Sequence, residues 1–270
     1  RRNLCFYNST EDAFLKSLPP ENLLIYGIHP LKMVIAHRFK AVSKLFLEQK
    51  QSKKTLSKLF EGMKSNIIHE IEKKLSLVDE KYLFEVTKNT HHQGIAGIIV
   101  PKNFESLKTL GGENNKKGRI LVLDQIQDPR NIGAIIRTSV QLGFRHIIFP
   151  DSHSSGMTAT VYKTSSGAIE LATLYQVTNI RQSLEIIKEK GFWVVGSVIP
   201  EMTEKVISLE ELPLDCPLAI VIGNEEKGLR KLTKEHCDFL VHIKTEYSAL
   251  SFNVSVAAAL LMFHVYHQTK

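Results

Sequence analysis

Apolar residues in the second half of the chain come in short continuous runs rather than in alternation with polar ones. The five runs are residues 120–123, 146–149, 192–198, 218–222 and 239–243, and segments with helical periodicity separate them. Continuous runs are typical of strands that are covered on both faces, as in a parallel sheet. Parallel strands need crossover connections, which are usually helical. The pattern therefore predicts an α/β unit with a mostly parallel sheet.

A second, smaller α/β unit is predicted in the first half of the chain. Its apolar runs predict strands at 23–27, 44–48 and 94–100, and the helical patterns cover 30–39 and 52–64. Polar residues precede it, and the glycine-rich stretch 111–118 is the best boundary in the chain. The expected organisation is listed here in order: a tail at 1–21, a smaller domain at 22–104, a linker at 105–117 and a larger domain at 118–270.

The segment Asp128-Pro-Arg-Asn-Ile-Gly-Ala-Ile-Ile-Arg137-Thr is predicted to open a helix, with Asp128 as its cap. Gly133 inside a helix costs about 1 kcal/mol relative to alanine, so it needs a reason. Arg137 lies four residues later, on the same face, and is predicted to lean over this bare position beside Asn131. A guanidinium there suits an RNA phosphate. The alternative is an ordinary amphipathic helix with a surface arginine.

The segment Ile-Gly223-Asn-Glu225-Glu-Lys-Gly228-Leu-Arg follows a predicted strand. It is not a phosphate-binding P-loop, because Leu229 stands where that motif requires lysine. The dinucleotide fingerprint G-x-G-x-x-G is also absent from the chain. What remains is a tight loop leading into a helix predicted over 229–237. It could line a site, or it could be a plain turn whose acids offset the helix dipole.

The third segment is Leu250-Ser-Phe-Asn253-Val-Ser-Val-Ala-Ala-Ala, which begins a helix made almost wholly of valine and alanine. Small side chains allow such a helix to pack closely against a neighbour. The helix could therefore be a buried core element in which Asn253 is only a cap. Alternatively, Ser251 and Asn253 could be site residues at the N-terminus of this helix.

In this order and spacing, the three segments resemble the signature motifs of the SpoU (TrmH-like) branch of the SPOUT methyltransferases. The resemblance implies S-adenosylmethionine-dependent methylation of an RNA ribose 2′-hydroxyl. It also implies an α/β catalytic domain with a deep trefoil knot, acting as a homodimer. Carried over by position, the expected catalytic residues are Arg137, Asn131, Ser251, Asn253 and Glu225, and the expected cofactor contacts are Gly223, Ile243, Leu250 and Phe252.

Two features refine these expected roles. Family proposals make the arginine the base for the hydroxyl proton, but a guanidinium is a poor base. We therefore expect Arg137 to anchor a phosphate and polarise the hydroxyl. Tyr247 stands where relatives commonly have glycine, so the local backbone of the cofactor loop is expected to differ.

The first half of the chain adds to the resemblance. Tyr26-Gly-Ile-His-Pro30 and His92-Gln-Gly94 are similar to the opening and the end of the family's substrate-binding domain, which is like ribosomal protein L30e. Two-domain members of this type are mostly methyltransferases of a guanosine in large-subunit (23S) ribosomal RNA. That is the expected function. A tRNA ribose methyltransferase and a non-catalytic RNA-binding protein with the same fold are the alternatives.

Composition narrows the class of protein further. Hydrophobic residues make up 43% and charged residues 23%, as in a folded chain, and a net charge of +7 is compatible with RNA. The three unpatterned cysteines argue against disulfides and zinc and suit the cytoplasm. His91-His92 lacks a carboxylate or cysteine at ligand spacing, so no metal is expected. No apolar run is long enough for a membrane span, and the first ten residues lack a signal-peptide core.

Overall fold

A computed structural model describes residues 19, 21–111, 118–151, 157–199, 206–247 and 251–269. The chain divides into two compact units. The smaller unit contains residues 1–102 and 157–170, and the larger contains 103–156 and 171–270. Of the tail expected at 1–21, all but residues 19 and 21 lie outside the described part of the chain.

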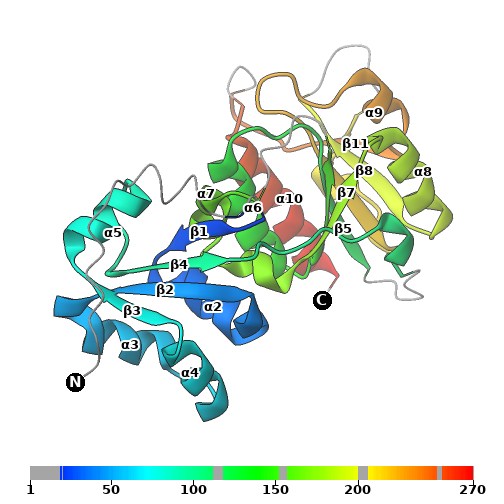
Figure 1. The fold of residues 1–270 in the computed structure, drawn as a ribbon. Coiled ribbons are helices and arrows are strands. Elements are labelled where there is room, and N and C mark those ends of the chain that lie inside the picture. The colour runs from blue at the N-terminus through cyan, green and yellow to red at the C-terminus, as the bar shows by residue number, and fades with distance from the viewer. Residues whose placement is uncertain are drawn as a thin grey trace. The chain divides into compact units, whose positions relative to one another are not determined.

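The smaller unit is a four-stranded sheet with helices on both faces (Figure 1). On one face, Leu83 of a helix packs with Ala96 and Ile98 of a central strand. On the other, a side chain at Gly97 would come within 2.7 Å of Leu31. The strands are β1 (Leu23–Tyr26), β2 (Val42–Glu48), β3 (Leu75–Val78) and β4 (Ile95–Ile99), in the order β1-β4-β2-β3; the helices are α2 (Ile28–Arg38), α3 (Ser52–Phe60), α4 (Ser65–Glu72), α5 (Glu80–Thr87) and α7 (Ala159–Thr164).

The strands and the first helix predicted for this unit are confirmed within two residues at each end. The helix predicted over 52–64 is confirmed over 52–60 and ends four residues earlier than predicted. The chain turns through Gly62, whose φ of 77° is in the left-handed region that glycine adopts readily. The elements α4, β3 and α5 were not predicted.

Residues 157–170 belong to the smaller unit, although they come from the sequence of the larger predicted domain. The Arg38 guanidinium at the end of α2 donates two hydrogen bonds to the buried Glu170 carboxylate, at 2.6 and 2.8 Å. The Tyr162 hydroxyl donates to the same carboxylate at 3.2 Å. Burial raises the pKa of Tyr162, and the charge of Glu170 raises it further. The smaller unit thus contains more of the chain than residues 22–104.

The larger unit is built on a seven-stranded sheet in which every pairing is parallel, as the continuous apolar runs predict. Two further strands, β7 and β9, were not predicted. β7 mixes polar and apolar residues, and β9 has only two residues. The strands are β5 (Arg119–Leu123), β6 (His146–Pro150), β7 (Thr173–Val177), β8 (Trp193–Ser197), β9 (Ile207–Ser208), β10 (Leu218–Ile222) and β11 (Phe239–His242), in the order β7-β6-β5-β10-β8-β11-β9.

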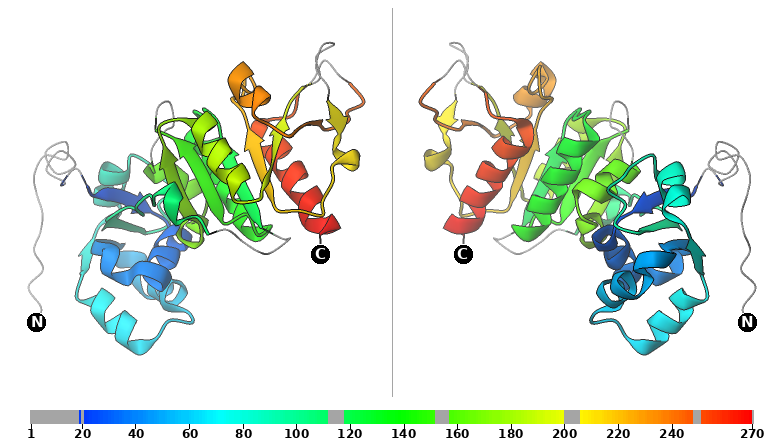
Figure 2. Two further views of the ribbon diagram at one scale, coloured as in Figure 1. Left: turned by 90° about the vertical axis from the view of Figure 1, so that its right-hand side faces the viewer. Right: turned by 90° about the vertical axis from the view of Figure 1, so that its left-hand side faces the viewer.

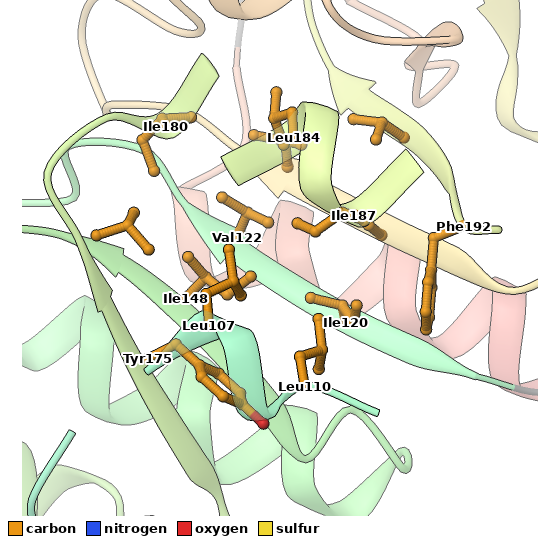
Figure 3. Packing of buried hydrophobic residues seen from close by; sticks show 14 of the residues in the cluster. Leu107, Leu110, Ile120, Val122, Ile148, Tyr175, Ile180, Leu184, Ile187 and Phe192 are labelled. Atoms are coloured by element: carbon orange, nitrogen blue, oxygen red, sulfur yellow. The ribbon is translucent and has the colours of Figure 1, made fainter. Parts of the chain in front are cut away.

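Helices cover both faces of this sheet. The helices α6 (Pro129–Gln141) and α10 (Val254–Gln268) lie side by side on one face, and α8 (Ile180–Glu189) and α9 (Lys231–Glu235) lie on the other (Figure 2). Beneath α8 is an apolar core that Ile187 and Phe192 help to form (Figure 3). Leu107 and Leu110 belong to this core, although their segment was expected to be a linker. In the part of the chain that the structure describes, no helix combines the length and apolar character of a membrane span.

Candidate active site

The three sequence motifs meet at the carboxyl ends of the central strands of the larger unit. β5 and β10 are neighbours, with Leu123 opposite Ile222. In the sheet, β6 and β7 lie on the β5 side of this pair, and β8, β11 and β9 lie on its β10 side. The chain first fills the β5 side and then crosses to the other. Such a change of direction leaves a crevice at the carboxyl ends, where α/β proteins commonly bind ligands.

The first motif forms the start of α6. Asp128 caps the helix by accepting a hydrogen bond from the Arg130 backbone N–H at 2.8 Å, as predicted. Hydrogen bonds from Arg130, mainly from its side chain, lower the pKa of the Asp128 carboxyl. Gly133 is among the buried residues of α6, whereas Arg137 is exposed. The expectation that Arg137 leans over Gly133 stays a prediction.

The second motif is a tight hairpin directly after β10. The backbone N–H groups of Asn224 and Gly228 each donate to the carbonyl of the other, at 3.1 and 3.0 Å. A side chain at Gly223 would lie within 2.5 Å of the Gly228 carbonyl oxygen and the Leu229 nitrogen. The helix predicted over 229–237 is confirmed only in part, since α9 covers five residues. This fold of the loop turns Glu225 toward the first motif.

A chain of hydrogen bonds joins the three motifs. The Asn131 amide donates to the Glu225 carboxylate at 3.1 Å, and the Asn253 amide donates to the Asn131 amide oxygen at 3.3 Å. The structure thus brings together three of the predicted catalytic side chains, which are up to 122 residues apart in the sequence. We refer to Asn131, Glu225 and Asn253 as the amide–carboxylate chain.

Asn253 also caps α10, so both interpretations of this residue hold together. Its side-chain oxygen accepts hydrogen bonds from the Ser255 backbone N–H at 2.9 Å and from the Ser255 hydroxyl at 2.6 Å. Ser255 was not among the predicted site residues. The signal that could have found it is a hydroxyl two residues after a helix cap, in a helix otherwise rich in valine and alanine.

A cavity of about 500 Å³ lies beside the amide–carboxylate chain. This volume is within the usual range for small-ligand sites, about 300–1,000 Å³. Five of the residues predicted for the cofactor or catalytic groups line it, namely Gly223, Glu225, Ile243, Ser251 and Phe252. Leu250, the remaining predicted cofactor contact, lies outside the described residues. Further lining comes from β8 and its following residues and from the segment after β11: Ser197, Val198, Ile199, His242, Lys244 and Thr245.

The cavity lining is suited to a molecule that is partly apolar and carries a positive charge. Its apolar walls include Val198, Ile222 and Ala257. Its charged groups are the Glu225 and Glu226 carboxylates and one lysine, Lys244, so carboxylates are in excess. The residues present therefore fit S-adenosylmethionine, which combines an adenine ring with a sulfonium centre.

Arg137 does not line this cavity. It lies in a separate groove of about 570 Å³ between α6 and α10, together with Ser255. Since Ser255 also bonds to Asn253, this groove and the amide–carboxylate chain share a residue. Tyr247 at the end of the cavity-lining segment is 70% exposed.

His92 of the histidine pair in the smaller unit has a structural role. The His92 ring is buried, and its Nδ1 accepts a hydrogen bond from the Gly94 backbone N–H at 3.1 Å. The neighbouring Gln93 side chain accepts from the Ile28 backbone N–H at 2.9 Å, which ties together the two segments that resemble the family's substrate-binding domain. Within the described ranges, no group of three potential ligands is suitable for a metal ion.

Two family models match the chain. The SpoU rRNA Methylase family matches residues 118–263, and the family described as RNA 2′-O ribose methyltransferase substrate binding matches residues 24–105. Together they cover both units.

Full-length relatives agree with these matches. The 23S rRNA (guanosine-2′-O-)-methyltransferase RlmB of Shewanella oneidensis is 33% identical over 92% of this chain and 98% of that protein. RlmB of Nitrosomonas europaea is 31% identical over 90% of this chain and 91% of that protein. Among solved structures, the SpoU methyltransferase AviRb of Streptomyces viridochromogenes in complex with AdoMet covers 97% of this chain and 94% of its own, with a TM-score of 0.73 and 18% identity.

Proposed function

The chain belongs to the SpoU rRNA methylase family, and from that premise we propose that it transfers a methyl group from S-adenosylmethionine to a ribose 2′-hydroxyl of ribosomal RNA. The observation that carries the proposal is the amide–carboxylate chain beside a cavity of nucleoside-cofactor size. A guanosine of large-subunit RNA is the proposed target, since RlmB relatives named for that reaction match nearly the whole chain.

S-adenosylmethionine would occupy the cavity and supply an already activated methyl group. The Gly223 hairpin, Ile243 and Phe252 would hold it, largely through backbone groups. Leu250 remains part of this proposal. The Glu225 and Glu226 carboxylates favour a positively charged ligand over a neutral one.

The chain's own residues would then position the acceptor ribose. Placement of two reactants can supply much of a rate enhancement, because it removes the entropy cost of their encounter. The hydrogen bond between Asn131 and Asn253 holds both side chains, so their other hydrogen-bonding groups have a fixed orientation. Ser251 lines the cavity at the same mouth. Arg137 is exposed in the groove and offers a guanidinium to an RNA phosphate.

RNA selection is proposed to lie with the smaller unit, whose family model is a substrate-binding one. Helix α3 supports this role, because Lys53, Lys54 and Lys58 are exposed on it and it carries no acidic residue. A solvated helix face is the plainer interpretation of such lysines. The tRNA alternative and the non-catalytic alternative make different predictions in the experiment below. The cytoplasm is the proposed location.

The functional assembly is proposed to be a homodimer through the larger unit, whose backbone we infer to be knotted as in the family. The support is an exposed apolar face on α10, where Val256, Leu260 and Phe263 are 44%, 37% and 55% exposed. The same residues line the groove that holds Arg137. A second copy on this face would bury these side chains and border the arginine.

Replacing Phe263 by aspartate should break this dimer. A charge at the centre of an apolar interface would be buried without a partner, and loss of such an anchor commonly costs 2 kcal/mol or more, about thirtyfold or more in affinity. Sedimentation at micromolar concentration should show a monomer. Phe84→Asp is the matched control, since Phe84 is 47% exposed on α5 of the smaller unit, and it should remain dimeric. Equal dimer stability in both variants would exclude this face as the interface.

One transfer assay tests the proposed function. The protein is incubated with labelled S-adenosylmethionine and, separately, with large-subunit ribosomal RNA and total tRNA, and 2′-O-methyl positions are mapped. We expect label at one guanosine ribose of ribosomal RNA, and calorimetric binding of the cofactor that raises the melting temperature. Label in tRNA alone would replace the proposed substrate by the alternative. RNA binding with neither transfer nor cofactor binding would make the protein a non-catalytic binder.

A further inference from the structure

A buried carboxylate outside the motif residues discussed so far holds the second motif in place. Asp124 follows β5 directly, and its side chain is 1% exposed. Its Oδ1 accepts a hydrogen bond from Arg230 Nη2 at 2.7 Å, and its Oδ2 accepts from Arg230 Nε at 3.3 Å. The Thr233 hydroxyl also donates to Oδ2, at 2.8 Å. The carboxylate therefore has three donors, all from the start of α9.

The next residue holds the other end of the same hairpin. The Gln125 carbonyl accepts a hydrogen bond from the Asn224 side-chain amide at 2.9 Å. Gln125 has a φ of 65°, a left-handed conformation that non-glycine residues adopt rarely and that needs support from its surroundings. Two consecutive residues at the end of β5 thus bind both ends of the loop 224–230.

The same end of β5 leads into α6, four residues before the cap Asp128. The distance between Asn131 and Glu225 therefore depends on how the loop 224–230 is fixed to β5. Glu225 accepts hydrogen bonds from the Asn131 amide and from the Asn224 amide, and the first of these connects it to the first motif. A loop released from Asp124 would be free to carry Glu225 away from Asn131 and to change the mouth of the cavity.

We propose that Asp124 is a positioning residue, which acts through Arg230 and Thr233 to hold the hairpin 223–228 in the geometry that binds S-adenosylmethionine and keeps Glu225 on Asn131. This inference rests on the proposed function. It concerns residues that touch neither the cavity nor the amide–carboxylate chain, because Asp124, Arg230 and Thr233 line neither.

Stability alone is a weak reason for this arrangement. Burying a carboxylate is costly, and a buried ion pair is often no more stabilising than apolar side chains of similar volume. Arg230 is moreover half exposed, with 49% of its side chain accessible, so its own contribution is screened. Two parallel hydrogen bonds from one guanidinium to a fixed carboxylate do define the position of the arginine, because both bonds must form together.

The test compares Asp124→Asn and Arg230→Gln with the unchanged protein. Asparagine keeps the shape of Asp124 but loses the charge that orients the guanidinium. In each variant we expect the Michaelis constant for S-adenosylmethionine to rise about tenfold, equivalent to about 1.4 kcal/mol, and that for RNA to stay within about twofold. Arg230→Lys keeps the charge without the fork and should fall between Arg230→Gln and the unchanged protein.

Hydrogen exchange without any cofactor gives an independent measurement. The backbone N–H groups of Asn224 and Gly228 each donate to the carbonyl of the other residue across the hairpin. They should exchange about tenfold faster in both variants, while β5 and β10 keep their protection. Arg181→Gln is the control, because Arg181 forms an exposed pair with Glu185 on α8 and should change neither measurement.

The outcomes separate this inference from the proposed function. Unchanged cofactor constants and unchanged hairpin exchange in both variants would overturn the positioning role. Faster exchange throughout the sheet, together with equal losses for cofactor and RNA, would overturn it in favour of a general stabilising role. If the unchanged protein failed to bind the cofactor, the proposed function would fail, whereas the exchange experiment would still show whether Asp124 holds the hairpin. Arg230→Gln keeps the test valid if Asp124→Asn does not fold.

Discussion

Replacing Arg137 by alanine should lower the rate of methyl transfer at least about a hundredfold, which corresponds to about 2.7 kcal/mol of transition-state stabilisation. The side chain is exposed in the groove between α6 and α10, where it can reach an RNA phosphate or the ribose. It does not line the cavity proposed for the cofactor. Single-turnover transfer should therefore fall steeply, while calorimetric affinity for S-adenosylmethionine changes by no more than about twofold.

Two further variants sharpen the result. Arg181→Ala removes an exposed arginine from α8 and should transfer methyl groups at the normal rate. Arg137→Lys keeps the charge but not the bidentate fork, so an anchoring role predicts partial recovery. If Arg137 instead removed the hydroxyl proton, lysine would act at lower pH than arginine, because it releases its proton more readily. Normal turnover by Arg137→Ala would remove the residue from the mechanism.

The sheet of the larger unit was predictable because its central strands are buried on both faces. Burial on both faces leaves a short continuous apolar run, as at Leu218–Ile222, and its length of about five residues favours a strand over a helix. β7 was not predicted, because it is an edge strand whose exposed Gln176 interrupts the apolar run. β9 was not predicted either, because a strand of two residues is too short to give a periodic pattern. The helix over 52–64 was predicted four residues too long, because Gly62, a glycine with positive φ, follows its end while the polar and apolar pattern continues.

The residues of the candidate site could be predicted from the sequence, but the hydrogen bonds between them could not. The resemblance of the three motifs to the SpoU family singled out Asn131, Glu225 and Asn253 one at a time, whereas their spacing alone left plainer interpretations open. Their hydrogen bonds depend on the pairing of β5 with β10, a contact between segments about a hundred residues apart. Asp124 was missed because, in the sequence, an acid after a strand resembles any other turn residue. Its role appears only once Arg230 and Thr233 are seen to point at it.

The extent of the smaller unit could not be predicted from the sequence either. Composition marked the glycine-rich stretch 111–118 as the boundary, since boundaries in folded chains are usually polar and flexible. Residues 157–170 lie beyond it, and contacts between residues far apart in the sequence attach them to the smaller unit, among them the Arg38–Glu170 pair and the packing of α7 on β1. A fragment limited to 22–104 would leave the Arg38 guanidinium without Glu170. Experiments on substrate selection are therefore better done with the full chain.

Replacing Gly223 by alanine should abolish useful cofactor binding, raising the dissociation constant for S-adenosylmethionine at least about a hundredfold, or about 2.7 kcal/mol. The added methyl group has no room, since it would lie within 2.5 Å of the Gly228 carbonyl oxygen and the Leu229 nitrogen. These are backbone atoms, so relief requires the hairpin to move. That movement would carry Glu225 away from Asn131 and reshape one wall of the cavity.

Gly111→Ala is the matched control, because a side chain at Gly111 would meet nothing within 4 Å. It should bind the cofactor normally. Overpacking costs about 1–3 kcal/mol, so Gly223→Ala should melt at a lower temperature but remain folded, which circular dichroism can establish before calorimetry. Because the strain is confined to the loop after β10, the variant should still bind ribosomal RNA. Cofactor affinity within about threefold of normal in folded Gly223→Ala would mean that this hairpin is not part of the cofactor site, and the cavity assignment would fail with it.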